Sequence, residues 1–308
     1  MDINMRIAVI GAGAMGSIYG GHLSQNNEVY LVDTAAQVVE HVRKEGIKIQ
    51  ENGEDVVYHP QAVTSTEGLE PVDLVILFVK SLFSRAALSG NKGLIGPDTY
   101  VMTLQNGSGH EDILGEFVGQ DHIVIGTTED NGAVLGLGHI RRGGEGNTNV
   151  GMLVEDKDGF LPKLKEAFDC CGFNVKIHAN IQQLIWNKLF TNVSLSAVTG
   201  ILQVDMGYIA SNEYAWAMTR RLIKEAVAVA HAMGLEADEE AIAAKVRKTS
   251  EMSPSGCTSI RADLRDGRKS EVDTISGSVV RAAAKVGVPV PCHEFVVNMV
   301  HALEGKNA

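Results

Sequence analysis

Residues 6–16 read RIAVIGAGAMG. An apolar run that favours a β-strand, 6–10, leads directly into the spacing G-x-G-x-x-G. In a strand–turn–helix unit, these glycines let the chain turn tightly, approach a pyrophosphate group and pack the helix closely on the strand. A second apolar run, 28–32, follows after a helix-length interval, and a glycine turn with no binding role is the alternative reading. The stretch predicts a Rossmann domain that binds a dinucleotide through Gly11, Ala12, Gly13, Ala14, Met15 and Gly16.

An acidic residue, Asp33, follows the second strand. A carboxylate at this point can accept hydrogen bonds from the adenosine ribose hydroxyls of NAD, and it repels the 2′-phosphate of NADP. The next four residues, 34–37, supply no arginine or lysine to neutralise that phosphate. The sequence therefore favours NAD(H) over NADP(H). Capping of the following helix is the alternative role for Asp33.

The two halves of the chain differ in their hydrophobic period. In the first half, further apolar runs at 74–79, 100–104 and 122–125 are separated by helix-length or loop stretches, as a mostly parallel sheet requires. From about residue 181 the period becomes helical. We therefore expect an α/β protein with a Rossmann domain over 1–180 and an all-helical substrate and catalytic domain over 181–308.

Two helices of the second half carry terminal signals. Asn212 can cap a helix over 213–233, which Gly234 can end. A later helix is expected to start at Glu271, with Ser270 as its N-cap and Asp273 as a further capping residue. We expect its apolar stripe to comprise Val272, Ile275, Val279 and Ala283. Gly287 and Pro289 should end the helix.

Composition excludes several classes of function. The chain has 308 residues and a formal net charge of -11, and its lysines and arginines form no basic cluster, which argues against nucleic-acid binding. The apolar run 74–79 is far shorter than a bilayer crossing requires, and the N-terminus lacks a signal-type pattern, so we expect a cytoplasmic protein. Four cysteines show neither zinc spacing nor disulfide-scaffold density, so no metal site is predicted.

Five separated motifs give the chain a resemblance to the ketopantoate reductase (2-dehydropantoate 2-reductase) family. They are the glycine turn 11–16, Phe78-Val-Lys80, Leu104-Gln-Asn-Gly107, Trp186-Asn-Lys-Leu-Phe-Thr-Asn192, and Ser259 followed by Asp263, Gly267-Arg268 and Ser270-Glu-Val-Asp273. The likeness runs over nearly the whole chain.

The resemblance implies that Lys188 is the general acid. Hydride addition to a ketone develops alkoxide charge, which a nearby cation can stabilise and then protonate. Asn192 and Ser196 follow Lys188 at i+4 and i+8, so the three polar groups lie on one face of a helix that is otherwise apolar. The alternative is a lysine whose stem lies along the helix and whose ammonium reaches solvent.

The resemblance also implies roles for further residues. Ser259 and Glu271 match a serine and a glutamate of the family: Ser259 would bind substrate, and Glu271 would contact the cofactor and orient the lysine. Lys80 and Asn106 would contact cofactor or substrate, and Val134 would touch the cofactor through its backbone. Glu271 could instead serve the helix dipole, and Asn106-Gly107 could be a plain turn.

The implied function is NAD(P)H-dependent reduction of a small 2-oxo acid, first of all 2-dehydropantoate to (R)-pantoate. Two departures favour an alternative, an NAD-dependent D-2-hydroxyacid dehydrogenase for other branched or aromatic 2-oxo acids. Asp33 replaces the basic residue of NADP-dependent members, and Ser196 replaces a second substrate-binding asparagine. NADP(H) is the family default. A protein that senses NAD(H) without turnover is a third reading, and base rates for soluble enzymes favour a homodimer.

Overall fold

The computed structural model describes residues 5–306. The chain forms two compact units. The first comprises the residues up to Gln105 together with His110–Ile181, and the second comprises Asn106–Gly109 and the residues from Gln182 onward. Within 5–306, no helix is long and apolar enough to cross a membrane.

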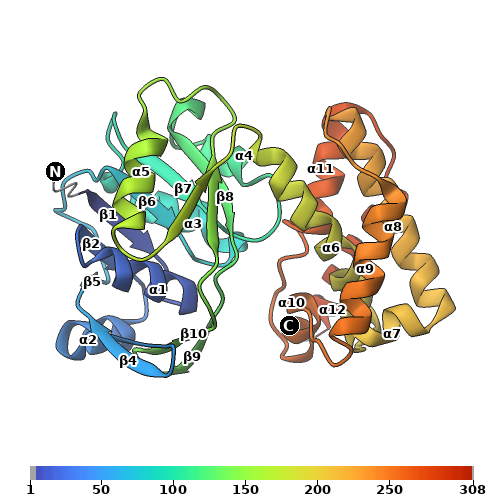
Figure 1. Ribbon diagram of the computed structural model, residues 1–308, viewed down its shortest axis with the longest axis horizontal. Coiled ribbons are helices and arrows are strands. Elements are labelled where there is room, and N and C mark those ends of the chain that lie inside the picture. The colour runs from blue at the N-terminus through green and yellow to red at the C-terminus, as the bar shows by residue number, and fades with distance from the viewer. Residues whose placement is uncertain (1–4, 307–308) are drawn as a thin grey trace. The chain divides into compact units, whose positions relative to one another are not determined.

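An eight-stranded sheet forms the centre of the first unit, in the order β12-β11-β8-β7-β6-β1-β2-β5 (Figure 1). All neighbouring strands are parallel except β8 and β11. The strands are β1 (Arg6–Ile10), β2 (Glu28–Val32), β5 (Gln61–Val63), β6 (Leu74–Leu77), β7 (Tyr100–Thr103), β8 (Ile123–Thr128), β11 (Asn147–Gly151) and β12 (Asn174–Ile177). The predicted mostly parallel sheet is confirmed, and β1 and β2 have the predicted bounds.

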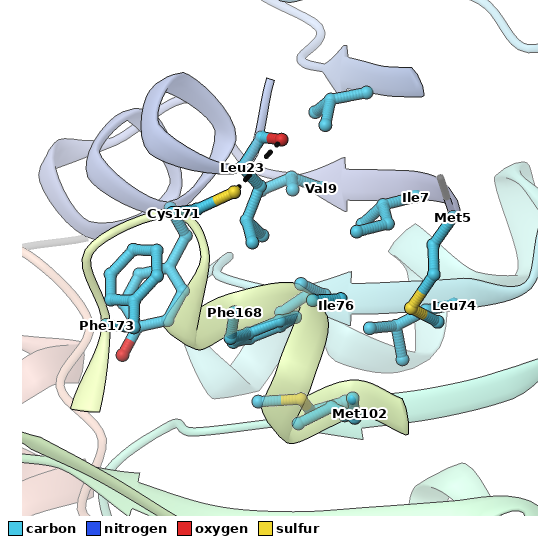
Figure 2. Close-up of a cluster of buried hydrophobic side chains, with 14 of the residues drawn as sticks. Met5, Ile7, Val9, Leu23, Leu74, Ile76, Met102, Phe168, Cys171 and Phe173 are labelled. Atoms are coloured by element: carbon cyan, nitrogen blue, oxygen red, sulfur yellow. Dashed lines mark hydrogen bonds between the residues drawn. The ribbon is translucent and has the colours of Figure 1, made fainter. Parts of the chain in front are cut away.

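Helices and short 3-10 turns connect these strands. They are α1 (Ala14–Leu23), α2 (Ala36–Glu45), η1 (Ser81–Phe83), α3 (Ser84–Gly90), η2 (Lys92–Leu94), α4 (His110–Leu114), η3 (Gln120–His122) and α5 (Phe160–Asp169). Figure 2 shows apolar side chains of β1, β6 and β7, among them Val9, Ile76 and Met102, gathered around Phe168 of α5. Because both faces of a parallel sheet are covered, its strands are apolar throughout rather than alternating.

A second sheet was not expected from the sequence. It has the order β4-β3-β10-β9 and comprises β3 (Ile47–Glu51), β4 (Glu54–Tyr58), β9 (Gly132–Gly136) and β10 (His139–Arg142). Asn52 and Gly53 have φ of 52° and 85° and join β3 to β4. Asn-Gly between strands is a hairpin signal that the sequence did carry. Helix α1 contacts strands of both sheets.

The second unit is helical, as predicted. Its helices are α6 (Ile181–Leu202), α7 (Met206–Ser211), α8 (Glu213–Ala232), α9 (Glu239–Met252), α10 (Ser259–Arg265), α11 (Ser276–Val286) and α12 (Pro291–Gly305). The side chain of Asn212 accepts hydrogen bonds from the N–H groups of Tyr214 and Ala215, and Gly234 takes φ of 79° after α8. Both terminal signals predicted for this helix are confirmed.

The predicted start of α11 is wrong by five residues. The helix begins at Ser276, and its N-cap, Ile275, makes no side-chain capping bond to any described residue. The predicted cap Ser270 donates its hydroxyl to Glu304 Oε1 at 2.7 Å, and the Asp273 carboxylate lies 3.0 Å from His301 Nε2. The Ser270 hydroxyl also accepts from the Val272 N–H at 3.4 Å, as a cap would, but the residues that follow form turns and the helix starts only at Ser276. The predicted stripe is buried as expected, and Gly287, with φ of 72°, ends the helix.

The turn between β1 and α1 depends on two close backbone approaches. Gly11 has φ of +104°, and a Cβ atom there would lie 2.8 Å from the Val79 nitrogen. At Gly16 a Cβ atom would lie 1.7 Å from the Gly11 carbonyl oxygen. At Gly13 a Cβ atom would meet no heavy atom of the described chain within 4 Å. Two of the three glycines are therefore required by packing, and Gly13 is not.

Gly16→Ala should therefore destabilise the protein while Gly13→Ala does not. Backbone atoms cannot move aside as a flexible side chain can, so we expect Gly16→Ala to cost about 3 kcal/mol or more of unfolding free energy. Gly13→Ala is the matched control and should unfold within about 0.5 kcal/mol of wild type. Urea titration of the purified variants measures both values. Equal stability of the two variants would contradict this account of the turn.

Candidate active site

The first turn of α1 offers backbone N–H groups to an anion. Gly13 is the N-cap, and in the described part of the chain no side chain caps this helix. The first N–H groups of a helix have no acceptor within the helix, and the positive end of its dipole lies there. With open space at Gly13, the residues present fit a pyrophosphate group lying over the turn.

Asp33 braces the same turn. Its Oδ2 accepts a hydrogen bond from the Ala12 N–H at 2.7 Å, and its Oδ1 accepts one from the Ala35 N–H at 2.8 Å. The N-cap of α2 is Ala35, so the alternative that Asp33 caps this helix is wrong. Each carboxylate oxygen has two lone pairs, and therefore both oxygens keep acceptor capacity for ribose hydroxyls.

Two basic residues of α2, Arg43 and Lys44, follow Asp33 in the sequence. Arg43, which comes ten residues later, donates its Nε to the Ala62 carbonyl at 2.7 Å. Lys44 pairs with Glu40 at 2.9 Å, and its pKa is raised by that hydrogen bond. Both cations thus have partners of their own.

Two other predicted cofactor residues belong to the first unit. Lys80 is half-buried and stands at the start of η1, just after β6. The preceding carbonyl, that of Val79, accepts a hydrogen bond from Gln105 Nε2 at 2.5 Å. Because Gln105 follows β7 and Val79 follows β6, this bond ties the ends of the two strands together next to Lys80.

Val134 lies in β9, opposite Ile140 of β10, with 61% of its surface exposed.

In the second unit, α6 presents the predicted polar face. Lys188 and Asn192 are half-buried, and Ser196 is buried with 5% exposure. The next polar residue at helical spacing, Thr199, is fully buried, and its hydroxyl lies 2.7 Å from that of Thr258. Lys188 is flanked on this helix by buried apolar residues, among them Ile185 and Leu189.

Helix α10 begins next to the C-terminal part of this face. Thr258 caps α10 by accepting from the Arg261 N–H at 3.4 Å, which makes the exposed Ser259 its first residue. At Gly200 a Cβ atom would lie 2.7 Å from Ile260 Cγ2, so the glycine lets α6 and α10 pack closely. Ser259 thus stands between Thr258 and Ile260, which pack against the C-terminal part of α6 at Thr199 and Gly200. Thr199 and Thr258 could not be identified as partners from the sequence, because 59 positions separate them.

Glu271 and Asn106 lie on segments that contact each other. The Thr274 carbonyl accepts a hydrogen bond from the Ser108 N–H at 3.0 Å. Gly107 has φ of +98°, and a Cβ atom there would lie 2.0 Å from the same carbonyl oxygen. The sequence places Asn106 after a strand of the Rossmann domain; in the structure its loop, Asn106–Gly109, belongs to the helical unit. The tight Asn-Gly turn expected there serves this contact.

The predicted residues therefore fall into two sets. The first unit carries Gly11–Gly16, Asp33, Lys80 and Val134, and the second carries Asn106, Lys188, Asn192, Ser196, Ser259 and Glu271. Of the motif residues without an assigned role, Asp263 accepts a hydrogen bond from Arg268 Nε at 3.0 Å. A search of residues 5–306 found no group of three or more histidine, cysteine, aspartate or glutamate side chains arranged to hold a metal ion.

Known proteins resemble the chain over its whole length. A 2-dehydropantoate 2-reductase of Lactococcus lactis subsp. lactis (strain IL1403) is 31% identical over 306 residues, which cover 97% of this chain and 98% of the relative. One of Halobacterium salinarum is 30% identical over 298 residues, with 96% and 98% covered.

Solved structures agree with these relatives. A ternary structure of D-mandelate dehydrogenase with NADH and anilino(oxo)acetate is 32% identical, with a TM-score of 0.87 over 98% of this chain and 99% of the other. The putative 2-dehydropantoate 2-reductase of Enterococcus faecalis is 29% identical, with a TM-score of 0.84 and the same coverage. The fold of this chain is thus shared, over nearly its whole length, with these two solved structures.

Two family models match the two halves of the chain. "Ketopantoate reductase PanE/ApbA" matches residues 7–155, and "Ketopantoate reductase PanE/ApbA C terminal" matches residues 180–304. The chain therefore belongs to the ketopantoate reductase PanE/ApbA family of NAD(P)-dependent oxidoreductases.

Proposed function

We propose that this protein reduces the keto group of 2-dehydropantoate to give (R)-pantoate, with NADH as the preferred reductant. The observation that carries the proposal is the polar face of α6, where Lys188, Asn192 and Ser196 stand at helical spacing among buried apolar residues. Relatives named 2-dehydropantoate 2-reductase along the full length of the chain support the substrate.

Lys188 is the proposed acid. The dinucleotide, when bound by the turn 11–16 and by Asp33, supplies a hydride to the carbonyl carbon. The Lys188 ammonium then stabilises the negative charge that develops on the carbonyl oxygen and transfers a proton to it, which yields the hydroxyl group. Glu271 orients the ammonium for this transfer.

The substrate carboxylate and hydroxyl need hydrogen-bond donors. Asn192 supplies an amide donor from α6, and Ser259 supplies a hydroxyl from the start of α10. Ser196 has a shorter reach than an asparagine and lacks an amide donor, so it leaves more room and fewer donors at that point of the face. Asn106 and Lys80 are assigned to the cofactor and to the nearby part of the substrate.

A D-2-hydroxyacid dehydrogenase activity on branched or aromatic 2-oxo acids is the second candidate. Asp33 and Ser196 favour it, because the first suits NAD and the second leaves room for a larger substituent. The 32% identity to a D-mandelate dehydrogenase solved with NADH supports it further.

A substrate panel separates the candidates. Steady-state oxidation of NADH and of NADPH is followed with 2-dehydropantoate, 2-oxoisovalerate and phenylglyoxylate. We expect 2-dehydropantoate with NADH to give the highest kcat/KM. A higher value for another acid with NADH would establish the second candidate in its place. Binding of NADH without turnover of any acid would contradict both and indicate a sensor.

Lys188→Ala tests the proposed acid. Loss of a general acid typically costs about 10²- to 10⁴-fold, so we expect kcat to fall within that range. NADH binding, measured by fluorescence titration, should be retained, because the turn 11–16 is unaffected. Lys224→Ala, which removes an exposed lysine of α8, is the matched control and should keep its kcat. Near-normal kcat in Lys188→Ala would rule out the assignment.

Asp33 should determine the cofactor preference. Asp33→Arg removes the repulsion of a 2′-phosphate and adds a cation beside it, so the ratio of kcat/KM for NADH to that for NADPH should fall at least about tenfold. Asp33→Asn removes the charge and one of the two acceptor oxygens that bind the Ala12 and Ala35 N–H groups. Because it adds no cation, it should show a smaller shift. An unchanged ratio in both variants would mean that Asp33 only braces the turn.

A further inference from the structure

The segment that carries Glu271 is not helical, and the C-terminal helix holds it from both sides. The backbone N–H and the hydroxyl of Ser270 both donate to Glu304 Oε1, at 2.8 and 2.7 Å. The other oxygen of Glu304 lies 2.9 Å from His301 Nδ1. His301 Nε2 in turn lies 3.0 Å from Asp273 Oδ1. The residues on either side of Glu271 are thus tied to one turn of α12.

The Glu304 carboxylate that accepts these hydrogen bonds is largely buried. Its side chain is only 8% exposed, although it lies in the last turn of α12. Burying a carboxylate is costly unless hydrogen bonds replace its hydration. Burial opposes the charged form, but the donors of Ser270 and His301 more than offset it and lower the pKa of Glu304. Burial likewise opposes the charged form of His301, whose pKa is nevertheless raised by hydrogen bonds to Glu304 and Asp273.

The tied segment is linked to a second predicted site residue. The N–H groups of Thr274 and Ile275 both donate to the Glu271 carbonyl, at 3.1 Å. The Thr274 carbonyl accepts from Ser108, two residues after Asn106. A displacement of Ser270 would therefore move the backbone that carries Glu271 and the loop that carries Asn106.

We propose that Glu304, supported by His301, is a positioning residue for catalysis: it fixes the Ser270–Asp273 backbone and thereby the Glu271 side chain. The proposal rests on the role proposed above for Glu271. Glu304 acts through Glu271, so its loss should lower turnover by the same route as loss of Glu271.

A double-mutant cycle tests this. In the intact protein, Glu304→Ala should lower kcat about tenfold, as loss of an outer hydrogen-bonding partner of a site often does. NADH affinity should be kept, because the glycine turn belongs to the other unit. In a Glu271→Gln background the same substitution should change kcat less than about twofold, because coupled residues are not additive.

Conservative variants separate positioning from general stability. Glu304→Gln keeps an oxygen acceptor for Ser270 and should restore most of the kcat lost in Glu304→Ala. Glu294→Ala removes an exposed carboxylate from the same helix and should leave kcat unchanged. Ser270→Ala removes the hydroxyl's bond to Glu304, together with its longer bond from the Val272 N–H at 3.4 Å, without leaving a charge unpaired. It should lower kcat in a folded protein even where Glu304→Ala fails to fold.

The outcomes distinguish the two proposals. Unchanged kcat in Glu304→Ala, or in Ser270→Ala where Glu304→Ala fails to fold, would overturn the positioning role. So would an equal loss with and without Glu271. Failure of the wild-type protein to reduce any 2-oxo acid in the substrate panel would overturn the proposed function, and the positioning role with it.

Discussion

Gly16 lies so close to the Gly11 carbonyl that a side chain of a single carbon would be 1.7 Å from that oxygen. This contact fixes where α1 begins, and the position of α1 determines where its first N–H groups point. The Ala12 N–H is directed into the Asp33 carboxylate at the end of β2. One backbone approach therefore aligns β1, α1 and β2, and the glycine turn and Asp33 depend on that alignment for what they offer to a dinucleotide.

The elements that could be predicted from the sequence are those with signals close by in the chain. β1 and β2 were predicted to the residue because buried parallel strands are continuous apolar runs between polar segments. α8 was predicted because Asn212 and Gly234 satisfy its terminal groups within a few positions. In each case the residues that determine the element lie within it or within a few positions of its ends.

The features that could not be predicted depend on residues that are far apart in the sequence. Ser270 looked like a helix cap, but its hydroxyl is bound by Glu304, 34 positions away. The loop Asn106–Gly109 follows a strand of the first unit, yet it is held by Thr274. β3 pairs with β10 across about ninety residues, and no local period reports such a partner. Candidates for the site can thus be named from motifs in the sequence, whereas the distant residues that hydrogen-bond to their segments cannot.

The long-range contacts that hold these segments in place are hydrogen bonds, and there is a physical reason for this. Apolar packing in the helical unit is non-directional, so it can hold helices together while leaving their rotation and axial position loosely defined. Hydrogen bonds depend on distance and angle, and a buried one is costly to break. The link between Thr199 and Thr258 sets α10 against α6, and the bonds of Glu304 set the Glu271 segment against α12. A site that must hold a lysine, a carboxylate and a substrate to within a fraction of an ångström requires such directional links, and the apolar core alone would not supply them.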